Sequence, residues 1–208
     1  MCVCVCVCVC VCVCVCATLC HAILYCYTLM YCSQLWRPHL LRHISALENV
    51  QRRSTKFILN DYTSNYKSCL TTLRLLPLMM LYELNDILFF VKYLKGPPNQ
   101  EFNIRQYFIF ISSSTRSSVH NKLVHKLAKS NTVKYSYFYR LPRLWNALPP
   151  IDLSNSYFSI KQSLQSFFWD HFVNNFDSDN PCSYHFLCPC HKCINAKGHN
   201  FTTSQLKL

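Results

Sequence analysis

Apolar residues recur at helical spacing in several parts of the chain. From residue 39 to residue 59 they repeat every three or four positions, directly after Pro38, a residue that is common at the start of a helix. A short helix is expected over residues 68–76, a long one over residues 78–94 and another over residues 157–173. These segments predict a mainly α-helical fold, in which the apolar faces of the helices pack together.

The segment from residue 39 to residue 59 divides into an apolar face and a basic face. At 100° per residue, one side carries Leu40, Ile44, Leu47, Val50, Phe57 and Ile58. The opposite side carries Arg42, Arg52, Arg53 and Lys56. A row of cations can follow a nucleic-acid backbone, so these four residues are the first candidates for phosphate contacts. An ordinary solvated surface helix is the alternative.

The other two long helices have apolar stripes. The stripe of residues 78–94 contains Leu81, Leu84, Leu88 and Val91, and Phe89, Phe90 and Leu94 widen it. This helix is therefore expected to be buried on most sides. The stripe of residues 157–173 contains Ile160, Leu164, Phe167, Phe168 and Phe172. His171 lies beside that stripe and is expected to be a packed residue rather than a metal ligand.

Residues 102–151 form an irregular segment with eight cations and no carboxylate. The cations can bind phosphates, and the many aromatic rings can stack on unpaired bases. Lys122, Lys126 and Lys129 are the second set of candidate phosphate contacts. A short strand is expected at residues 135–139, and Trp145 is expected to anchor the proline-bounded segment 141–150 against the core. The alternative is that the aromatic residues are core and the cations are merely solvated.

Cysteine and valine alternate without a break from Cys2 to Val15, and Cys16 closes the series. The codons TGT and GTG would write this run as the repeat TGTGTG, so we interpret it as a translated microsatellite joined to an older coding segment. This interpretation also places the start codon in question. The low-complexity run suits a strand or a helix, and the uncharged residues 2–31 are long enough to cross a bilayer. A small membrane-anchored protein that spans through residues 2–31 is therefore kept as an alternative function.

The chain has 208 residues and a net charge of +12, from 21 Lys and Arg against nine Asp and Glu. Such an excess favours a polyanionic partner, most often RNA or DNA. Glycine occurs only twice, and no glycine-rich phosphate loop is present, which argues against a nucleotide-binding enzyme complete in this chain. The sequence contains no adjacent pair of carboxylates of the kind that two-metal catalysis uses, so we expect no enzymatic activity.

The C-terminal tail groups cysteine and histidine at spacings of two or three residues. Cys182, His185, Cys190 and Cys193 are the expected ligands of a structural zinc ion, with Cys188, His191 and His199 as alternates. Unpaired reduced thiols and disulfides are the two other interpretations. A zinc-dependent interaction module in the tail is thus a further candidate function.

Changes in composition divide the chain into five parts. They are a Cys-Val low-complexity segment (1–19), a helical region (20–95), a basic and aromatic connecting region (96–150), a C-terminal helix (151–175) and a Cys/His-rich tail (176–208).

Several segments, in this order, resemble the C-terminal region of the reverse transcriptase of LINE-type (non-LTR) retrotransposons of the jockey-like group. They read MYCSQLWRP at 30–38, LENVQRRSTKFI at 47–58, LLPL at 75–78, ELND at 83–86, TRSS at 115–118 and LPRLWNALP at 141–149. The Cys/His tail also resembles the ends of such proteins. The resemblance runs from about residue 24 to about residue 193.

In that family the corresponding region follows the palm and forms the helical thumb that grips template and primer. The resemblance therefore implies a thumb-like helical bundle that binds RNA, DNA or their hybrid. The family's endonuclease, fingers and palm, including the Tyr/Phe-Ala-Asp-Asp motif, have no counterpart in this sequence. The resemblance thus implies a catalytically inactive remnant, with at most residual, non-specific nucleic-acid binding.

Overall fold

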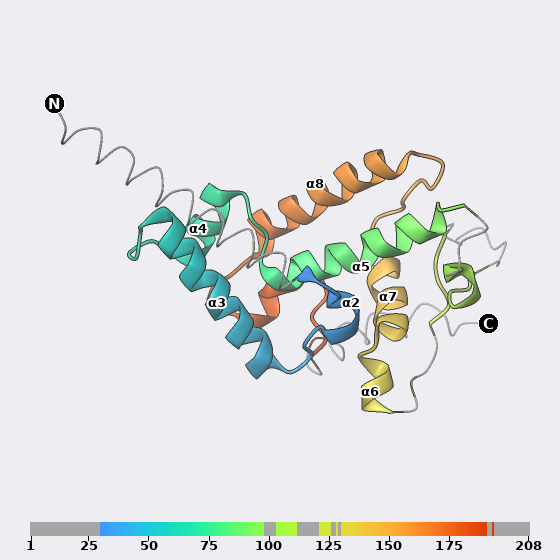
Figure 1. The fold of residues 1–208 in the computed structure, drawn as a ribbon, viewed down its shortest axis with the longest axis horizontal. Coiled ribbons are helices and arrows are strands. Elements are labelled where there is room, and N and C mark those ends of the chain that lie inside the picture. The colour runs from blue at the N-terminus through green and yellow to red at the C-terminus, as the bar shows by residue number, and fades with distance from the viewer. Residues whose placement is uncertain are drawn as a thin grey trace, which may run out of the picture.

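The computed structural model describes residues 30–97, 103–111, 121–125, 128, 130–190 and 193. These residues are mainly helical, which confirms the expected fold class (Figure 1). In chain order the elements are α2 (Ser33–Trp36), α3 (Leu41–Leu59), α4 (Tyr66–Leu73), α5 (Leu78–Leu94), η1 (Ile104–Gln106), α6 (Asn131–Lys134), α7 (Tyr137–Asn146), α8 (Tyr157–Asn175) and η2 (Pro181–Tyr184). The described parts of the chain contain no β-strand, although Phe110 and Leu123 form an isolated antiparallel bridge.

Side-chain caps fix where two of the helices begin. The Asn65 side chain accepts a hydrogen bond from the backbone N–H of Ser68, and Ser156 accepts one from Ser159. Each cap satisfies a donor in the first turn that has no partner within its helix. Helix α3 ends where Asn60 takes a left-handed conformation with φ of 50°, a geometry that asparagine tolerates better than most residues.

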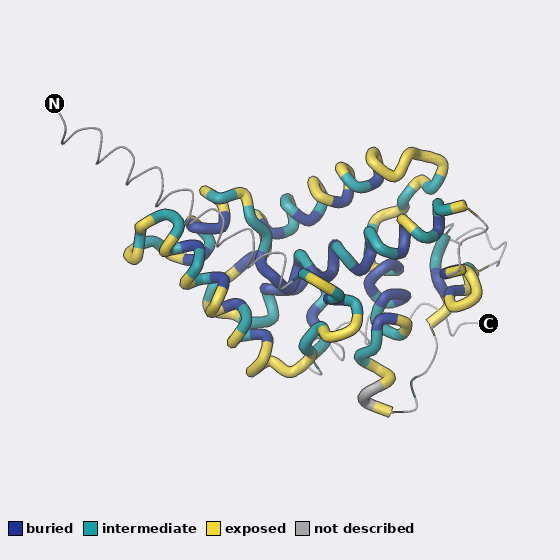
Figure 2. Tube along the Cα trace, viewed as in Figure 1, coloured by how far each residue is buried: buried dark blue, intermediate teal, exposed yellow. Residues whose placement is uncertain are grey.

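Helix α5 is the centre of the fold and packs against α2, α3, α7 and α8 (Figure 1). Its side chains are buried around most of its circumference, as the broad apolar stripe predicts, and Tyr82, Ile87 and Phe90 are fully buried. Figure 2 shows burial along nearly its whole length. A helix covered on so many sides holds its neighbours in fixed positions, so α5 sets the arrangement of the rest.

Helix α8 covers one side of α5 with the face that the sequence predicts. Ile160, Leu164, Phe168 and Phe172 are buried there, and Phe167 is partly buried. The ring of His171 packs edge-on against Phe186, with 5.1 Å between centroids, as expected for a packed histidine.

The buried face of α3 differs from the expected one. Its buried residues are Ile44, Glu48, Gln51 and Thr55, whereas Val50 and Phe57 are exposed. The polar residues can turn inward because each has a partner there: Glu48 accepts from the Tyr66 hydroxyl at 2.7 Å, and Gln51 donates to the Leu76 carbonyl at 3.0 Å. Satisfied hydrogen bonds remove the main cost of burying a polar group.

Residues 135–139 do not form the expected strand, because Tyr137 begins α7. The buried residues of this helix follow helical spacing: they are Tyr137, Leu141, Pro142, Leu144 and Trp145. Pro142 lies inside the helix rather than at a bounding turn. Trp145 does anchor the segment, since it is buried and its Nε1–H donates to the Asn121 carbonyl at 2.7 Å.

Among the helices in the described ranges, none is both long enough and apolar enough to cross a membrane. The proposed span at residues 2–31 lies outside those ranges except for its last two residues.

Candidate metal centre and basic surface

Four cysteines of the tail come together in space. The Sγ atoms of Cys182, Cys188, Cys190 and Cys193 all lie within 4.8 Å of one another, and all four residues are free thiols. The Sγ atoms of Cys182 and Cys190 are 3.8 Å apart, far beyond the length of a disulfide bond. The arrangement is compatible with a metal site.

Local hydrogen bonds hold these cysteines in place. Asn180 caps η2 by accepting from the backbone N–H of Cys182 at 3.0 Å. Arg143 Nη2, on α7, donates to the carbonyl of Cys188 at 3.0 Å. The backbone N–H of Cys193 points at Cys190 Sγ, 3.4 Å away, and so favours negative charge on that sulfur. The group is therefore attached both to its own turn and to the helical body.

Three of these thiols, Cys188, Cys190 and Cys193, differ in acidity. Although desolvation opposes it, hydrogen bonds from Cys193 and neighbouring thiols lower the pKa of Cys190 to about 7. Desolvation raises the pKa of Cys193 to about 11, and so does the hydrogen bond between its thiol and Cys190. Desolvation also raises the pKa of Cys188. Among these three thiols, Cys190 is therefore the most acidic.

His185 is not a member of this group, so the expectation that it serves as a ligand is wrong in this structure. Its buried ring turns to α5, with Nδ1 3.4 Å from Glu83 Oε1 and 3.2 Å from Arg37 Nη2. Cys188, which the sequence offered as an alternate, occupies the fourth position. His191 and His199, the other alternates, lie outside the residues that the structure describes.

Buried ion pairs connect the N-terminal part of the fold with α5 and α7. Arg37 contacts Glu83 at 2.8 Å and Asp86 at 3.1 Å, and Arg140 contacts Asp86 at 2.8 Å. Desolvation alone would raise the pKa of Glu83, but the charges and hydrogen bonds of Arg37 and His185 lower it to about 2. No expectation from the sequence covers this network, although two carboxylates within the largely apolar segment 78–94 are a visible signal of internal partners.

Five carboxylates of the described residues are buried or engaged in their own loops, whereas Asp170, Asp177 and Asp179 are exposed. Glu48, Glu83 and Asp86 are buried. Asp61 and Asp152 hold their own loops through hydrogen bonds to neighbouring serine and threonine residues. Many of the cations, by contrast, lie on the surface.

Arg52 is not free on that surface, contrary to its expected role in phosphate binding. Its Nη2 donates to the Ser178 carbonyl at 3.1 Å and to the Tyr184 hydroxyl at 3.2 Å. Its guanidinium lies over the Tyr66 ring, 5.0 Å from the centroid. The tail folds back onto this side of α3, so Arg52 fastens η2 to the helix.

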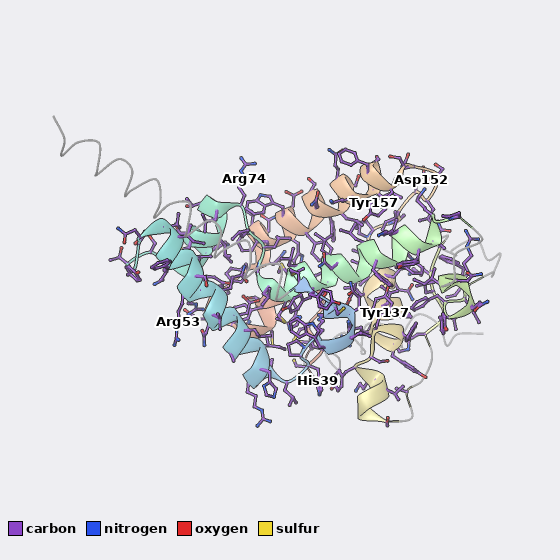
Figure 3. All side chains as sticks on the ribbon, viewed as in Figure 1. His39, Arg53, Arg74, Tyr137, Asp152 and Tyr157 are labelled. Atoms are coloured by element: carbon purple, nitrogen blue, oxygen red, sulfur yellow. The ribbon has the colours of Figure 1, made fainter. Side chains whose placement is uncertain are left out.

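The other three cations of α3 lie along one side of the helix, and we call them the α3 basic stripe: Arg42, Arg53 and the half-buried Lys56. Arg42 and Arg53 are exposed and lie on the same side of the helix, about 16 Å apart along its axis. Lys56 Nζ donates to the Tyr62 carbonyl at 3.0 Å and retains two further protons. Arg53 points away from the body of the molecule (Figure 3), and exposed residues recur along the outer side of α3 (Figure 2).

The second set of candidates is only partly described. Lys122 is half-buried, and its carbonyl accepts from Ile111 N–H at 2.8 Å beside the isolated bridge. Lys126 and Lys129 lie outside the described residues. Of this set, the structure therefore places Lys122 alone.

Comparison of the chain with protein-family models, with curated proteins and with solved structures gives no match.

Proposed function

We propose that this protein is a non-catalytic nucleic-acid-binding protein, the remnant of a non-LTR retrotransposon reverse transcriptase. The observation that carries the binding proposal is the α3 basic stripe. Three of the carboxylates that could have paired with surface cations, Glu48, Glu83 and Asp86, are buried inside the fold. Cations that lack carboxylate partners are available to phosphates, and each phosphate neutralised releases condensed counterions from the nucleic acid.

Two exposed aromatic rings near the stripe favour a single strand over a duplex. Phe57 is 58% exposed and Tyr62 is 63% exposed, although large aromatic residues are usually buried. Phe57 follows Lys56 directly, and Tyr62 accepts the Lys56 hydrogen bond through its backbone. Rings beside cations can stack on unpaired bases while the cations hold the backbone.

We propose that the protein is not catalytic because two of its carboxylates, Glu83 and Asp86, are buried and paired with arginines. Glu83 and Asp86 meet at Arg37, but both are buried and bound to arginines. Carboxylates in that state are not open to the magnesium ions of phosphoryl transfer, which need accessible oxygen ligands. The retrotransposon origin rests on the quoted segments; two of them, residues 30–38 and 83–86, meet in this ion-pair network.

The binding proposal is tested by fluorescence anisotropy with labelled single-stranded RNA, single-stranded DNA and duplex at about 50 mM salt. Arg42→Glu/Arg53→Glu reverses the charge of the two exposed cations of the stripe. Arg74→Glu/Lys92→Glu is the matched control, because it makes the same change of charge at exposed positions elsewhere, and Arg74 points to the opposite side from Arg53 in Figure 3.

We expect the stripe variant to bind single strands at least about tenfold more weakly, which is about 1.4 kcal/mol, and the control variant to lose much less. Undetectable binding by the natural chain, or equal losses in both variants, would reject the stripe as a binding site.

We also infer that the four-cysteine group holds a structural zinc ion. Zinc–sulfur bonds of about 2.3 Å in a tetrahedron place sulfur atoms about 3.8 Å apart, which agrees with the 3.8 Å between Cys182 and Cys190. The four thiols also supply a complete protein ligand set, as structural rather than catalytic zinc sites have. The ion would fasten the tail, which already bonds to α3 and α7.

Zinc content per chain tests this inference, and the cysteines of the N-terminal run supply the control. In one variant the four tail cysteines become serine; in the other, the eight cysteines of residues 2–16 do. One zinc per chain should persist in the second variant and disappear in the first. Zinc that follows the N-terminal run, or no zinc in either protein, would refute the tail site.

A further inference from the structure

A cavity with a volume of about 340 Å³ lies between α5, α7 and the tail. Its walls come from residues 37–39, from the start of α7 and the residues just before it, from His125 and Ala128, and from Leu187 and Pro189 of the tail. The volume falls within the range of small-molecule sites. Much of the lining is apolar, with cations converging on it, which is the usual composition of a ligand pocket.

The charges around this cavity do not cancel. Arg37 and Arg140 are balanced by Glu83 and Asp86. Arg143 has no carboxylate within ion-pair distance among the described residues, and Lys134 is exposed at the rim. Two cations therefore remain uncompensated.

Arg143 is the residue best placed to receive an anion. One of its nitrogens donates to the Cys188 carbonyl, which holds the guanidinium at the cavity wall. A guanidinium has five N–H donors in a planar fork that fits phosphate oxygens, so further donors remain after that hydrogen bond. Desolvation, followed by the charge of Arg143, lowers the pKa of His125, so the two side chains are close enough to interact at this cavity.

The remaining wall suits an organic body attached to the anion. His39 and Tyr135 stack with 4.1 Å between ring centroids and form a flat surface at the cavity edge. Pro38, Leu144 and Leu187 supply apolar contacts. The cavity therefore offers cations to the anionic group of a ligand and apolar or aromatic side chains to its organic part.

We propose that this cavity binds a phosphate monoester of nucleotide size, with the phosphate on Arg143 and Lys134. The site is separate from the α3 basic stripe and does not depend on it. The same chemical group occurs on a free mononucleotide and at the 5′ end of a nucleic-acid strand, and the experiment separates these two sources.

Isothermal titration of the full-length chain is done with cytidine 5′-monophosphate, cytidine and inorganic phosphate at constant ionic strength. The variants are Arg143→Gln, Lys134→Gln and Arg53→Gln, the last as a control in the stripe. Zinc content and circular dichroism check that each variant is folded. We expect the monophosphate to bind, cytidine not to bind, and Arg143→Gln to weaken binding about tenfold or more while Arg53→Gln leaves it unchanged.

Because Lys134 is exposed at the rim, Lys134→Gln keeps the test valid if Arg143→Gln fails to fold. We expect Lys134→Gln to weaken binding of the monophosphate several-fold. Tighter binding of a 5′-phosphorylated than of a 5′-hydroxyl oligonucleotide, lost in the same variants, identifies the strand end as the source. Binding of the mononucleotide alone identifies a small molecule. No binding of either phosphate monoester, equal binding of cytidine, or unchanged affinity in a folded Arg143→Gln or Lys134→Gln protein would overturn the proposal.

Discussion

Glu48 of α3 accepts a hydrogen bond from the backbone N–H of Met79, 3.0 Å away in the first turn of α5. Pro77 precedes that turn and offers no side-chain cap of its own. The carboxyl group of one helix therefore caps another helix 31 positions later in the chain. Because the group is fully buried, desolvation raises the pKa of Glu48 to about 7, although hydrogen bonds from Met79 and Tyr66 oppose the shift.

This raised pKa predicts how stability depends on pH. The folded state holds the Glu48 proton more tightly than the unfolded state, whose pKa is near 4.5. The contribution of this group is therefore full below about pH 4.5 and is lost as the pH rises to about 7, by roughly 3 kcal/mol in all. Glu48→Gln should remove that slope, as measured by urea unfolding at several pH values. An identical slope in the variant would contradict the assignment.

A second prediction concerns the buried ion pairs. Asp86→Asn should lower the free energy of unfolding by about 3–5 kcal/mol, because Arg140 would lose the one carboxylate it pairs with among the described residues and Arg37 would keep only Glu83. Lys92→Gln, on the exposed side of the same helix, should change it by less than about 0.5 kcal/mol. Chemical denaturation of both variants gives the comparison, and a small effect of Asp86→Asn would show that the network is not structural.

Neighbouring arginines on α3 should behave differently. Arg52→Gln should lower the free energy of unfolding by about 1–3 kcal/mol, because Arg52 bonds to Ser178 and Tyr184. Arg53→Gln should leave stability unchanged and weaken oligonucleotide binding instead. Thermal unfolding and anisotropy on the same two proteins separate the roles, and a reversed pattern would mean that the tail does not pack on Arg52.

Helix α8 offers an internal comparison of burial. Phe168 is fully buried, whereas Phe158 is 65% exposed on the same helix. Phe168→Ala should cost about 3–5 kcal/mol, since it leaves a cavity against α5. Phe158→Ala should cost less than about 0.5 kcal/mol. Similar losses from both substitutions, measured by denaturant unfolding, would indicate that α8 does not pack as described.

Sequence periodicity was sufficient for α5 and α8, because both are long and have strong apolar stripes. It failed for α7, where the run of aromatic residues before Pro142 resembled a strand and the helical spacing of Tyr137, Leu141 and Trp145 went unused. It also misassigned the inner face of α3. The partners that make Glu48 and Gln51 suitable for burial belong to α4 and to the turn before α5, which the local pattern cannot reveal.

The metal centre and the basic surface were also predictable only in part from the sequence. Spacing identified the cysteine-rich tail, but the choice between His185 and Cys188 depended on Glu83, which lies about a hundred positions earlier in the chain. The same limit applies to Arg52, whose partners come from the returning tail. Long-range contacts of this kind decide which side chains remain available to a ligand.

The salt dependence of single-strand binding tests the central claim most directly. If the α3 basic stripe contacts phosphates, log Kobs should fall linearly with log salt concentration, with a slope of about −0.7 for each cation in contact. Arg42→Glu/Arg53→Glu should make that slope shallower by at least about 1.4, while Arg74→Glu/Lys92→Glu leaves it unchanged. A slope near zero for the natural chain, or the same slope in both variants, would contradict nucleic-acid binding through α3.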